Sequence, residues 1–501
     1  MKRLITFGAV VAVLLGACGQ STPNGGSASG GAGGTINAGG ISNAGGTSNT
    51  GGAPNNGGVC NVSIPSEAGD TCDVESPVDA GVPLDAGSAL DLAKVGPYAV
   101  GHVNYTLSDP ASYARSVIVG VWYPVDPATI TSATPPAQYP LDEWTNKLPV
   151  STSRDWEALG YDPAYEAPAP SHNEPFPLVI VSPGFGSTNW CYLYIGTRLA
   201  SHGFVVAATD HDGDPQYPWS ASDNNVLYDR PRDVSFAITE LLQKNDTVGE
   251  LLYGVMAPSK IAMSGHSYGG YATLALAGGD DYICETEPAG DGGPSQQVCV
   301  ATPPDPRIKA IVGLDPSDQA MRYKEMARIS VPSLILGEAI EHIISYMGDT
   351  VANSQGNART HAAINRADSY RVDVTMANHI SFSNGCDGAK VMASVGVDAS
   401  TIASIYGPID STSFCGTRGG FDPTTNPATH QIVTTYMLAF LNTYLGREDN
   451  SWMLTSNYAR QYQPNVEFFD AEACSECPVG DGMYAYRPHP CQCSVALKEP
   501  Q

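Results

Sequence analysis

Short apolar runs alternate with longer amphipathic stretches through the middle of this chain, from about residue 96 to residue 447. The run Leu178–Val181 contains no polar side chain, which is typical of a strand buried on both faces of a sheet. Val234, Ile238 and Leu241 instead recur at helical spacing. This alternation predicts an α/β domain whose mostly parallel central sheet is covered by helices on both faces.

The same patterns predict the individual elements. The predicted strands are 98–107, 116–123, 176–182, 204–209, 261–264, 308–314, 333–336 and 371–376. The predicted helices are 153–159, 190–202, 230–242, 268–277 and 432–444. Turn residues separate the first two strands, so we expect these strands to form a hairpin.

Composition divides the chain into five parts. Residues 1–17 combine a basic start, an apolar run and small residues, which is typical of a signal peptide. Residues 18–58 are rich in Gly, Ser and Asn and predict a flexible linker. Residues 59–95 are acidic and predicted to be partly ordered. We expect the catalytic domain at 96–447 and a cysteine-rich tail at 448–501.

The end of the first part, Leu15-Gly16-Ala17-Cys18, resembles a bacterial lipobox. The resemblance implies cleavage before Cys18 and attachment of lipid to its thiol, with ordinary secretion as the alternative. We therefore expect an envelope protein, anchored by lipid to the membrane, and most readily the outer one because no Asp follows the cysteine. No other stretch is long and apolar enough to predict a transmembrane helix.

The charge balance limits the possible partners. The chain has 25 basic and 51 acidic residues, a net charge of −26, which argues against nucleic acid and against a polybasic membrane contact. Its 12 cysteines, in an exported protein, predict disulfides that bracket loop insertions and the tail. Connectivity does not follow from the sequence. We expect a monomer.

The strongest chemical signal is Gly265-His266-Ser267-Tyr268-Gly269, which lies between a predicted strand and a predicted helix. In a nucleophile elbow the turn is so tight that the residues two before and two after the serine must be small. The serine hydroxyl is then held above the sheet. This context predicts Ser267 as the nucleophile.

A serine nucleophile needs a base that is oriented by an acid, and in this architecture the chain order is serine, acid, histidine. Asp315 and His379 each follow a predicted strand and should meet at the carboxyl edge of the sheet. We predict them as acid and base. Glu341, which follows the strand between them, is the alternative acid.

An oxyanion hole requires two N–H donors. Tyr268 follows the nucleophile and is expected to supply one. The turn Pro183-Gly184-Phe185 follows a buried strand, and we expect the Phe185 N–H to supply the other. Serine hydrolysis needs no metal or cofactor, so none is expected.

These motifs together resemble α/β-hydrolases of the platelet-activating-factor acetylhydrolase type, with the neighbouring bacterial polyester hydrolases and dienelactone-hydrolase-like esterases. The matching pieces are Gly96-Pro97-Tyr98, Val121-Trp122-Tyr123-Pro124, Arg230-Pro231-Arg232-Asp233-Val234, Gly265–Gly270, Leu314-Asp315 and His379-Ile380-Ser381-Phe382. The acetylhydrolase-like members imply Asp315 as the acid, whereas the polyester hydrolases imply Glu341. Ser182-Pro183-Gly184 departs from the His-Gly of the acetylhydrolases and is closer to the polyester hydrolases.

The resulting expectation is an exported serine hydrolase that cleaves carboxylic esters through an acyl-enzyme. The expected substrates are small-molecule or lipid esters with short acyl groups, including phospholipid acetyl esters. A polyester or cutinase-like hydrolase is the first alternative. A peptidase or amidase on the same residues, and a non-catalytic surface binding protein on the same fold, are the others.

Overall fold

The computed structural model describes residues 92–470 except 111–112, 144–145, 212–225, 282, 284–299, 319–320, 339–342, 347–348 and 407–425. The described residues belong to one of the two compact units into which the chain divides, the one that includes residues 86–501. The predicted signal peptide, linker and acidic segment up to residue 91 lie outside the described residues, as do residues 471–501 of the tail.

The elements of the described part are as follows. The strands are β1 Ala99–Asp109, β2 Tyr113–Val125, β3 Gln138–Pro140, β4 Val150–Thr152, β5 Tyr165–Glu166, β6 Phe176–Ser182, β7 Val205–His211, β8 Met256–Ser267, β9 Ile308–Pro316, β10 Ser333–Glu338, β11 Ile343–Tyr346, β12 Asp349–Ala352, β13 Ser369–Val374 and β14 Val466–Asp470. The helices are α3 Ser153–Glu157, α4 Leu193–Ser201, α5 Val226–Asp246, α6 Tyr268–Gly278, α8 Tyr323–Met326, α9 Asn353–Ile364, α10 Gly385–Ser394, α11 Ala399–Tyr406, α12 Asn426–Tyr444 and α13 Ser456–Tyr462. Among the 3₁₀ turns are η3 Asn189–Tyr192 and η4 His379–Phe382.

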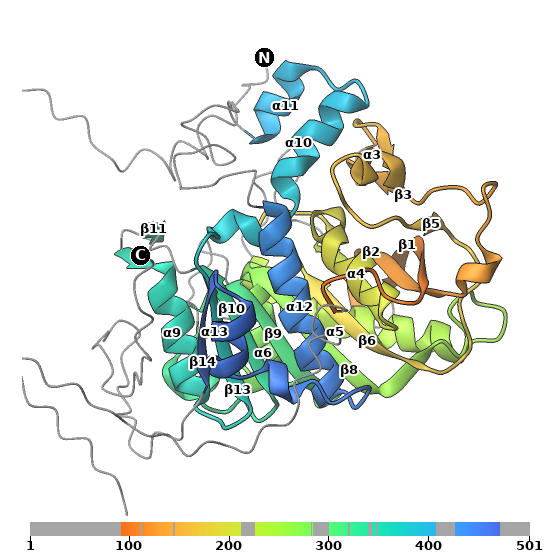
Figure 1. Cartoon of the computed structure of the whole chain (residues 1–501). Helices are drawn as coiled ribbons and strands as arrows, with labels where there is room; N and C mark the ends of the chain where they lie inside the picture. The colour runs from red at the N-terminus through yellow and green to blue at the C-terminus, as the bar shows by residue number, and fades with distance from the viewer. Residues whose placement is uncertain are drawn as a thin grey trace, which may run out of the picture. The chain divides into compact units, whose positions relative to one another are not determined.

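The central sheet has ten strands in the order β14-β13-β10-β9-β8-β6-β7-β2-β1-β5 (Figure 1). Its neighbouring strands β13, β10, β9, β8, β6 and β7 run parallel, while β2 is antiparallel to both β1 and β7. This mixed, mostly parallel sheet fits the α/β-hydrolase fold that the sequence predicts. The β1–β2 hairpin is also confirmed.

The sheet separates two apolar cores because successive side chains of a strand point to opposite faces. In β6, Val179 and Val181 pack into the core that α4 and α12 cover. Leu178 and Ile180 pack into the core that α5, α6 and α9 cover. All four side chains are fully buried, as the continuous apolar run predicts.

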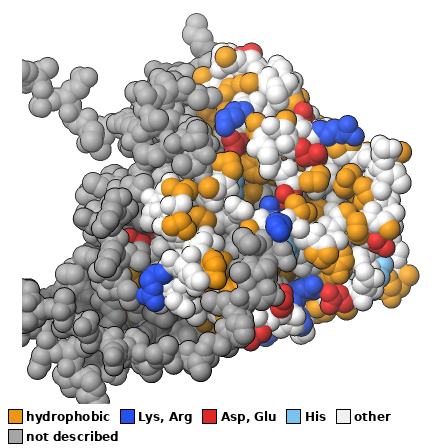
Figure 2. Space-filling model, in the orientation of Figure 1, with side chains coloured by type: hydrophobic (Ala, Val, Ile, Leu, Met, Phe, Trp, Pro, Cys, Tyr) orange, Lys and Arg blue, Asp and Glu red, His pale blue; other side chains and the backbone are white. Residues whose placement is uncertain are grey.

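The structure adds elements that no clear periodic pattern of apolar residues predicts. β14 extends the sheet as an antiparallel edge strand beside β13, and it comes from the segment after residue 447. Helices α9, α10 and α11 form in the long connections around β13. No helix in the part of the chain that the structure describes has the length and apolarity to cross a membrane. On the viewed face, charged side chains of both signs are scattered among uncharged ones (Figure 2).

Several histidines are buried in this fold. His102 lies between the rings of Trp122 and Tyr139, at centroid distances of 4.9 and 4.8 Å, and neither ring nitrogen has a hydrogen-bond partner among the described residues. Burial lowers the pKa of His102 to about 3. Burial is also the main cause that lowers the pKa of three others, to about 4 for His211, about 3 for His266 and about 4 for His430.

These four histidines should make the fold sensitive to acid. A histidine whose pKa is lower in the folded state than its unfolded value of about 6.5 binds its proton mainly after unfolding, so stability is lost as the pH falls below about 6.5. Each such group steepens the loss by about 1.4 kcal/mol per pH unit. We expect the free energy of unfolding, measured by urea denaturation, to fall as the pH is lowered from 7.5 to 5. The slope stays below four protons taken up on unfolding, because the raised pKa values of the Glu143 and Asp373 carboxyls, about 7 and about 6, make the folded state bind protons there. His102→Phe should reduce that slope by about one proton. A stability that does not change over this range would contradict the assignment.

Candidate active site

Ser267 occupies a strained position between β8 and α6. It is the last residue of β8 and the N-cap of α6, with φ 54° and ψ −117°, a conformation that non-glycine residues rarely adopt. A Cβ added to Gly265 would lie 2.1 Å from the Gly269 carbonyl oxygen. A Cβ added to Gly269 would lie 1.9 Å from the Ser182 carbonyl oxygen. The turn therefore has no room for a side chain at either glycine.

Asp315 and His379 come together at the same edge of the sheet. Asp315 lies near the end of β9, and His379 begins η4 after β13. His379 Nδ1 is hydrogen-bonded to Asp315 Oδ2, and the Asn357 side chain donates to Asp315 Oδ1 at 2.6 Å. Burial alone would raise the pKa of Asp315, but the hydrogen bonds and the charge of His379 hold it below its usual value. The carboxyl group is therefore ionised near neutral pH and orients the imidazole.

The elbow lies next to this pair. Ser267 is opposite Pro316 in the pairing of β8 with β9, and its carbonyl oxygen accepts from the Ser317 N–H at 2.9 Å. The ring of the adjacent His266 lies 4.6 Å from the ring of His379. The Ser267 hydroxyl makes no hydrogen bond with any described residue. In unliganded enzymes such bonds are often long and tighten only when substrate binds.

The two predicted oxyanion donors are also neighbours. The rings of Phe185 and Tyr268 lie 5.4 Å apart, and a Cβ added to Gly184 would lie 3.5 Å from the Cβ of Ser267. No described residue accepts a hydrogen bond from the Phe185 N–H. The Tyr268 N–H is in the first turn of α6, where intrahelical acceptors are missing. Both N–H groups are thus located beside the serine.

Sequence reasoning did not predict a hydrogen-bonded chain beneath these donors. The Gly184 N–H donates to the Tyr192 hydroxyl at 2.8 Å, and this hydroxyl lies 2.8 Å from His266 Nδ1. His266 Nε2 lies 2.8 Å from the His379 carbonyl oxygen, which can only accept, so Nε2 carries the proton and Nδ1 accepts from Tyr192. Burial and the charge of His379 lower the pKa of His266, which keeps this ring neutral. These hydrogen bonds connect the turn at Gly184 to the backbone of His379.

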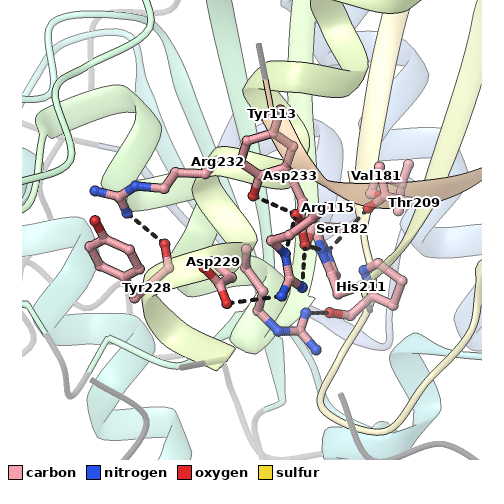
Figure 3. Close-up of polar contacts among 12 residues, drawn as sticks. Tyr113, Arg115, Val181, Ser182, Thr209, His211, Tyr228, Asp229, Arg232 and Asp233 are labelled. Carbon is pink, nitrogen blue, oxygen red and sulfur yellow. Dashed lines mark hydrogen bonds and ion pairs between the residues drawn. The ribbon is translucent and has the colours of Figure 1, made fainter. Parts of the chain in front are cut away.

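A second acid–histidine–serine array lies under the same turn (Figure 3). Asp233 accepts from His211 Nδ1 at 2.9 Å, from Arg115 at 3.0 Å and from the Tyr113 hydroxyl at 2.7 Å. The other ring nitrogen of His211 lies 2.9 Å from Ser182 Oγ. Ser182 has no exposed surface, so a substrate cannot reach its hydroxyl. This array fixes the end of β6 and is not a second active site.

Other residues of interest lie near the site or outside the described part of the chain. Glu341 and Cys18 lie outside the described residues. Cys191, which lies in η3, is a buried free thiol. Asp210, which follows Thr209 in β7, accepts a hydrogen bond from the Asn189 N–H at 2.5 Å. No group of three or more metal-ligating side chains occurs in the part of the chain that the structure describes.

Comparison with known proteins agrees with this geometry at the level of the family group. A family profile described as platelet-activating factor acetylhydrolase, isoform II, matches residues 88–231. Cutinase est1 of Thermobifida alba is 27% identical over 210 residues, 41% of this chain and 57% of the relative. Cutinase est2 of Thermobifida alba is 29% identical over 176 residues, 35% and 45% of the two chains. Cutinase cut1 of Thermobifida fusca is 28% identical over 174 residues, 35% and 42%.

The chain thus spans about half the length of the curated relatives it matches. Both likenesses support the group that the sequence motifs indicate, which joins acetylhydrolase-like proteins and bacterial polyester hydrolases. At a general level they support a carboxylic ester hydrolase.

The steric fit of the elbow gives a test. Gly269→Ala would place a Cβ against backbone that cannot move without separating β6 from α6, so we expect loss of the folded state or of all ester hydrolysis. Gly356→Ala in α9 is the matched control, since its Cβ would lie 3.4 Å from the nearest atom, Asp318 Oδ1. Thermal unfolding and hydrolysis rates of both variants check this. An active, stable Gly269→Ala protein would refute the close contact.

The choice of acid can be tested by two isosteric changes. Asp315→Asn would keep the shape but remove the charge and the acceptor that selects the His379 tautomer, so we expect kcat to fall by about 10³- to 10⁴-fold. Glu341→Gln should leave kcat within about threefold of wild type, because Asp315 would still be present. Steady-state hydrolysis of p-nitrophenyl butyrate, with thermal unfolding to check folding, measures both. A larger loss in Glu341→Gln would transfer the role to Glu341.

Proposed function

We propose that this protein is an exported serine hydrolase that cleaves carboxylic esters through an acyl-enzyme. The observation that carries the proposal is the arrangement at one edge of the sheet. The strained Ser267 elbow, the hydrogen-bonded pair of His379 and Asp315, and the unbonded N–H of Phe185 all lie there. Esters are the substrate class that the similarity to acetylhydrolases and cutinases supports.

In the proposed reaction, Ser267 Oγ attacks the ester carbonyl carbon and His379 Nε2 takes the hydroxyl proton. Asp315 accepts the hydrogen bond from His379 Nδ1 and stabilises the imidazolium that forms. His379 then gives the proton to the leaving alcohol as the tetrahedral intermediate collapses to the acyl-enzyme. Water, activated by the same imidazole, releases the acid and restores Ser267.

Negative charge on the carbonyl oxygen is the main electrostatic demand of both steps. The N–H groups of Phe185 and Tyr268 are proposed to donate to this oxyanion, an effect worth on the order of 3 kcal/mol for each donor. Their place beside Ser267 supports the assignment. Because no described residue accepts from the Phe185 N–H, that donor needs no rearrangement before it acts.

The proposed substrates are small-molecule or lipid esters with short acyl groups, including phospholipid acetyl esters, as the acetylhydrolase profile suggests. A polyester or cutinase-like hydrolase is the second candidate, and the Thermobifida cutinases among the relatives favour it. Phe185 is 45% exposed beside the proposed site, where its ring is available to contact either kind of acyl chain. We further propose that the enzyme acts in the cell envelope as a monomer, anchored through lipid on Cys18.

The assay is hydrolysis of p-nitrophenyl acetate, butyrate and longer esters, and of a polyester film, by the purified protein. We expect Ser267→Ala to abolish hydrolysis and to prevent labelling by a phosphonate, because the nucleophile is gone. Ser264→Ala is the matched control. Ser264 is buried in the same strand, and its hydroxyl has no hydrogen-bond partner among the described residues, so this variant should remain active. Equal turnover by wild type and Ser267→Ala would disprove the proposal. Preference for film over soluble esters would select the polyester candidate.

A further inference from the structure

A fully buried guanidinium lies directly behind the proposed oxyanion turn. Arg230, on α5, has no exposed surface. Its Nη1 donates to the Pro183 carbonyl oxygen at 2.5 Å, and its Nη2 donates to the Gly184 carbonyl oxygen at 3.1 Å. Taking a charge out of water is costly, so a buried arginine is informative about the groups that it contacts.

The Gly184 carbonyl and the Phe185 N–H are two ends of one planar peptide unit. A cation that binds the carbonyl oxygen draws electron density toward it through the amide resonance, and the N–H at the other end becomes a stronger donor. The Phe185 N–H has no acceptor among the described residues. The Phe185 N–H, which the guanidinium polarises, is therefore the donor that would bind the substrate oxyanion.

Other contacts prevent this peptide from rotating away. In the preceding peptide, the Gly184 N–H donates to the Tyr192 hydroxyl at 2.8 Å, and the Gly184 oxygen of this peptide also accepts from the Ser187 N–H at 3.1 Å. Just before the turn, Ser182 Oγ lies 2.9 Å from His211 Nε2, within the buried cluster of Figure 3. Arg230 thus acts on a turn whose orientation is already fixed by hydrogen bonds at Gly184 and at Ser182.

We propose that Arg230 is a positioning residue whose charge, transmitted through the Gly184–Phe185 peptide, strengthens the Phe185 N–H as an oxyanion donor; this inference rests on the ester hydrolysis proposed above. Arg230 itself does not touch the substrate. Because negative charge on the carbonyl oxygen develops in the transition state, the guanidinium stabilises that state more than the bound ester. Its removal should lower kcat and leave KM nearly unchanged.

The test compares Arg230→Gln, which keeps donors but removes the charge, with Arg230→Lys, which keeps the charge. Removing a direct oxyanion donor costs about 10²- to 10³-fold in kcat, so we expect about 10- to 100-fold for the indirect effect in Arg230→Gln. KM should change by less than about threefold. Inhibition by a boronic acid, whose adduct with the serine is a tetrahedral anion, should weaken by the same factor as kcat. Arg230→Lys should recover at least half of the loss on a logarithmic scale.

Arg232→Gln is the matched control on the same helix. The Arg232 guanidinium lies 3.4 Å from the centre of the Tyr228 ring and donates to the Thr302 hydroxyl, away from the turn (Figure 3). Its loss should leave kcat and boronic acid inhibition unchanged. Phosphonate labelling counts intact sites in every variant, so that rates refer to folded protein alone.

Three results would overturn the inference. The first is a folded Arg230→Gln protein with kcat and boronic acid affinity equal to wild type. The second is an Arg230→Lys protein that loses as much as Arg230→Gln, because charge would then not be the cause. The third is an Arg230→Lys protein that does not fold, which would assign Arg230 a purely structural role. Failure of the proposed function can be told apart from failure of this inference. If the proposed function is wrong, the wild-type protein itself shows no ester hydrolysis that depends on Ser267.

Discussion

The close approach of β6 to the start of α6 is the constraint on which the site depends. The Cα of Gly269 lies so near the Ser182 carbonyl that a Cβ would come within 1.9 Å of the oxygen. This contact sets the turn 183–185 beside Ser267, and so brings the N–H groups of Phe185 and Tyr268 to one place. Strain at Ser267 follows from the same geometry, since the chain must reverse direction within one residue.

Beneath this contact, the charged guanidinium of Arg230 is buried together with imidazole and phenol groups that stay neutral. Arg230 is fully buried, and its charge acts on the buried side chains of Tyr192, His211 and His266. Burial first, and then the charge of Arg230, lowers the pKa of His211. Burial, His379 and Arg230 act in the same direction on His266. These imidazoles therefore supply directed hydrogen bonds without adding positive charge beside His379, which the proposed mechanism protonates.

The parts of the fold and site that sequence could predict are those whose cause is local. The apolar run of β6, the glycines around Ser267, and the order of Ser267, Asp315 and His379 along the chain all follow from neighbouring residues or from strand order.

The partners of these residues come from far away in sequence. Asn357 reaches Asp315 across 42 positions, Tyr192 reaches His266 across 74, and Arg230 reaches Gly184 across 46. A polar side chain on a helix carries no periodic signal for such a contact, because the packing of the sheet and not the helix decides what it meets. Arg230 and Asp233 illustrate this. They lie three residues apart in the motif, but Arg230 binds the turn at Gly184 and Asp233 binds His211 in the buried cluster.

The domain contains two aspartate–histidine pairs, and they show that a hydrogen bond between a carboxylate and an imidazole is not enough to assign a catalytic role. Asp233–His211 and Asp315–His379 each join a carboxylate to Nδ1 of an imidazole. The His211 side chain is 2% exposed, its Nε2 lies against Ser182, and burial with the nearby Arg230 disfavours its protonated form. The His379 side chain is 17% exposed and stands at the sheet edge next to the elbow. An imidazole that must accept and return a proton needs access to the reacting atoms and tolerance of positive charge, and only the second pair offers both. Exposure and the placement of Arg230 thus separate a structural array from a proposed catalytic one.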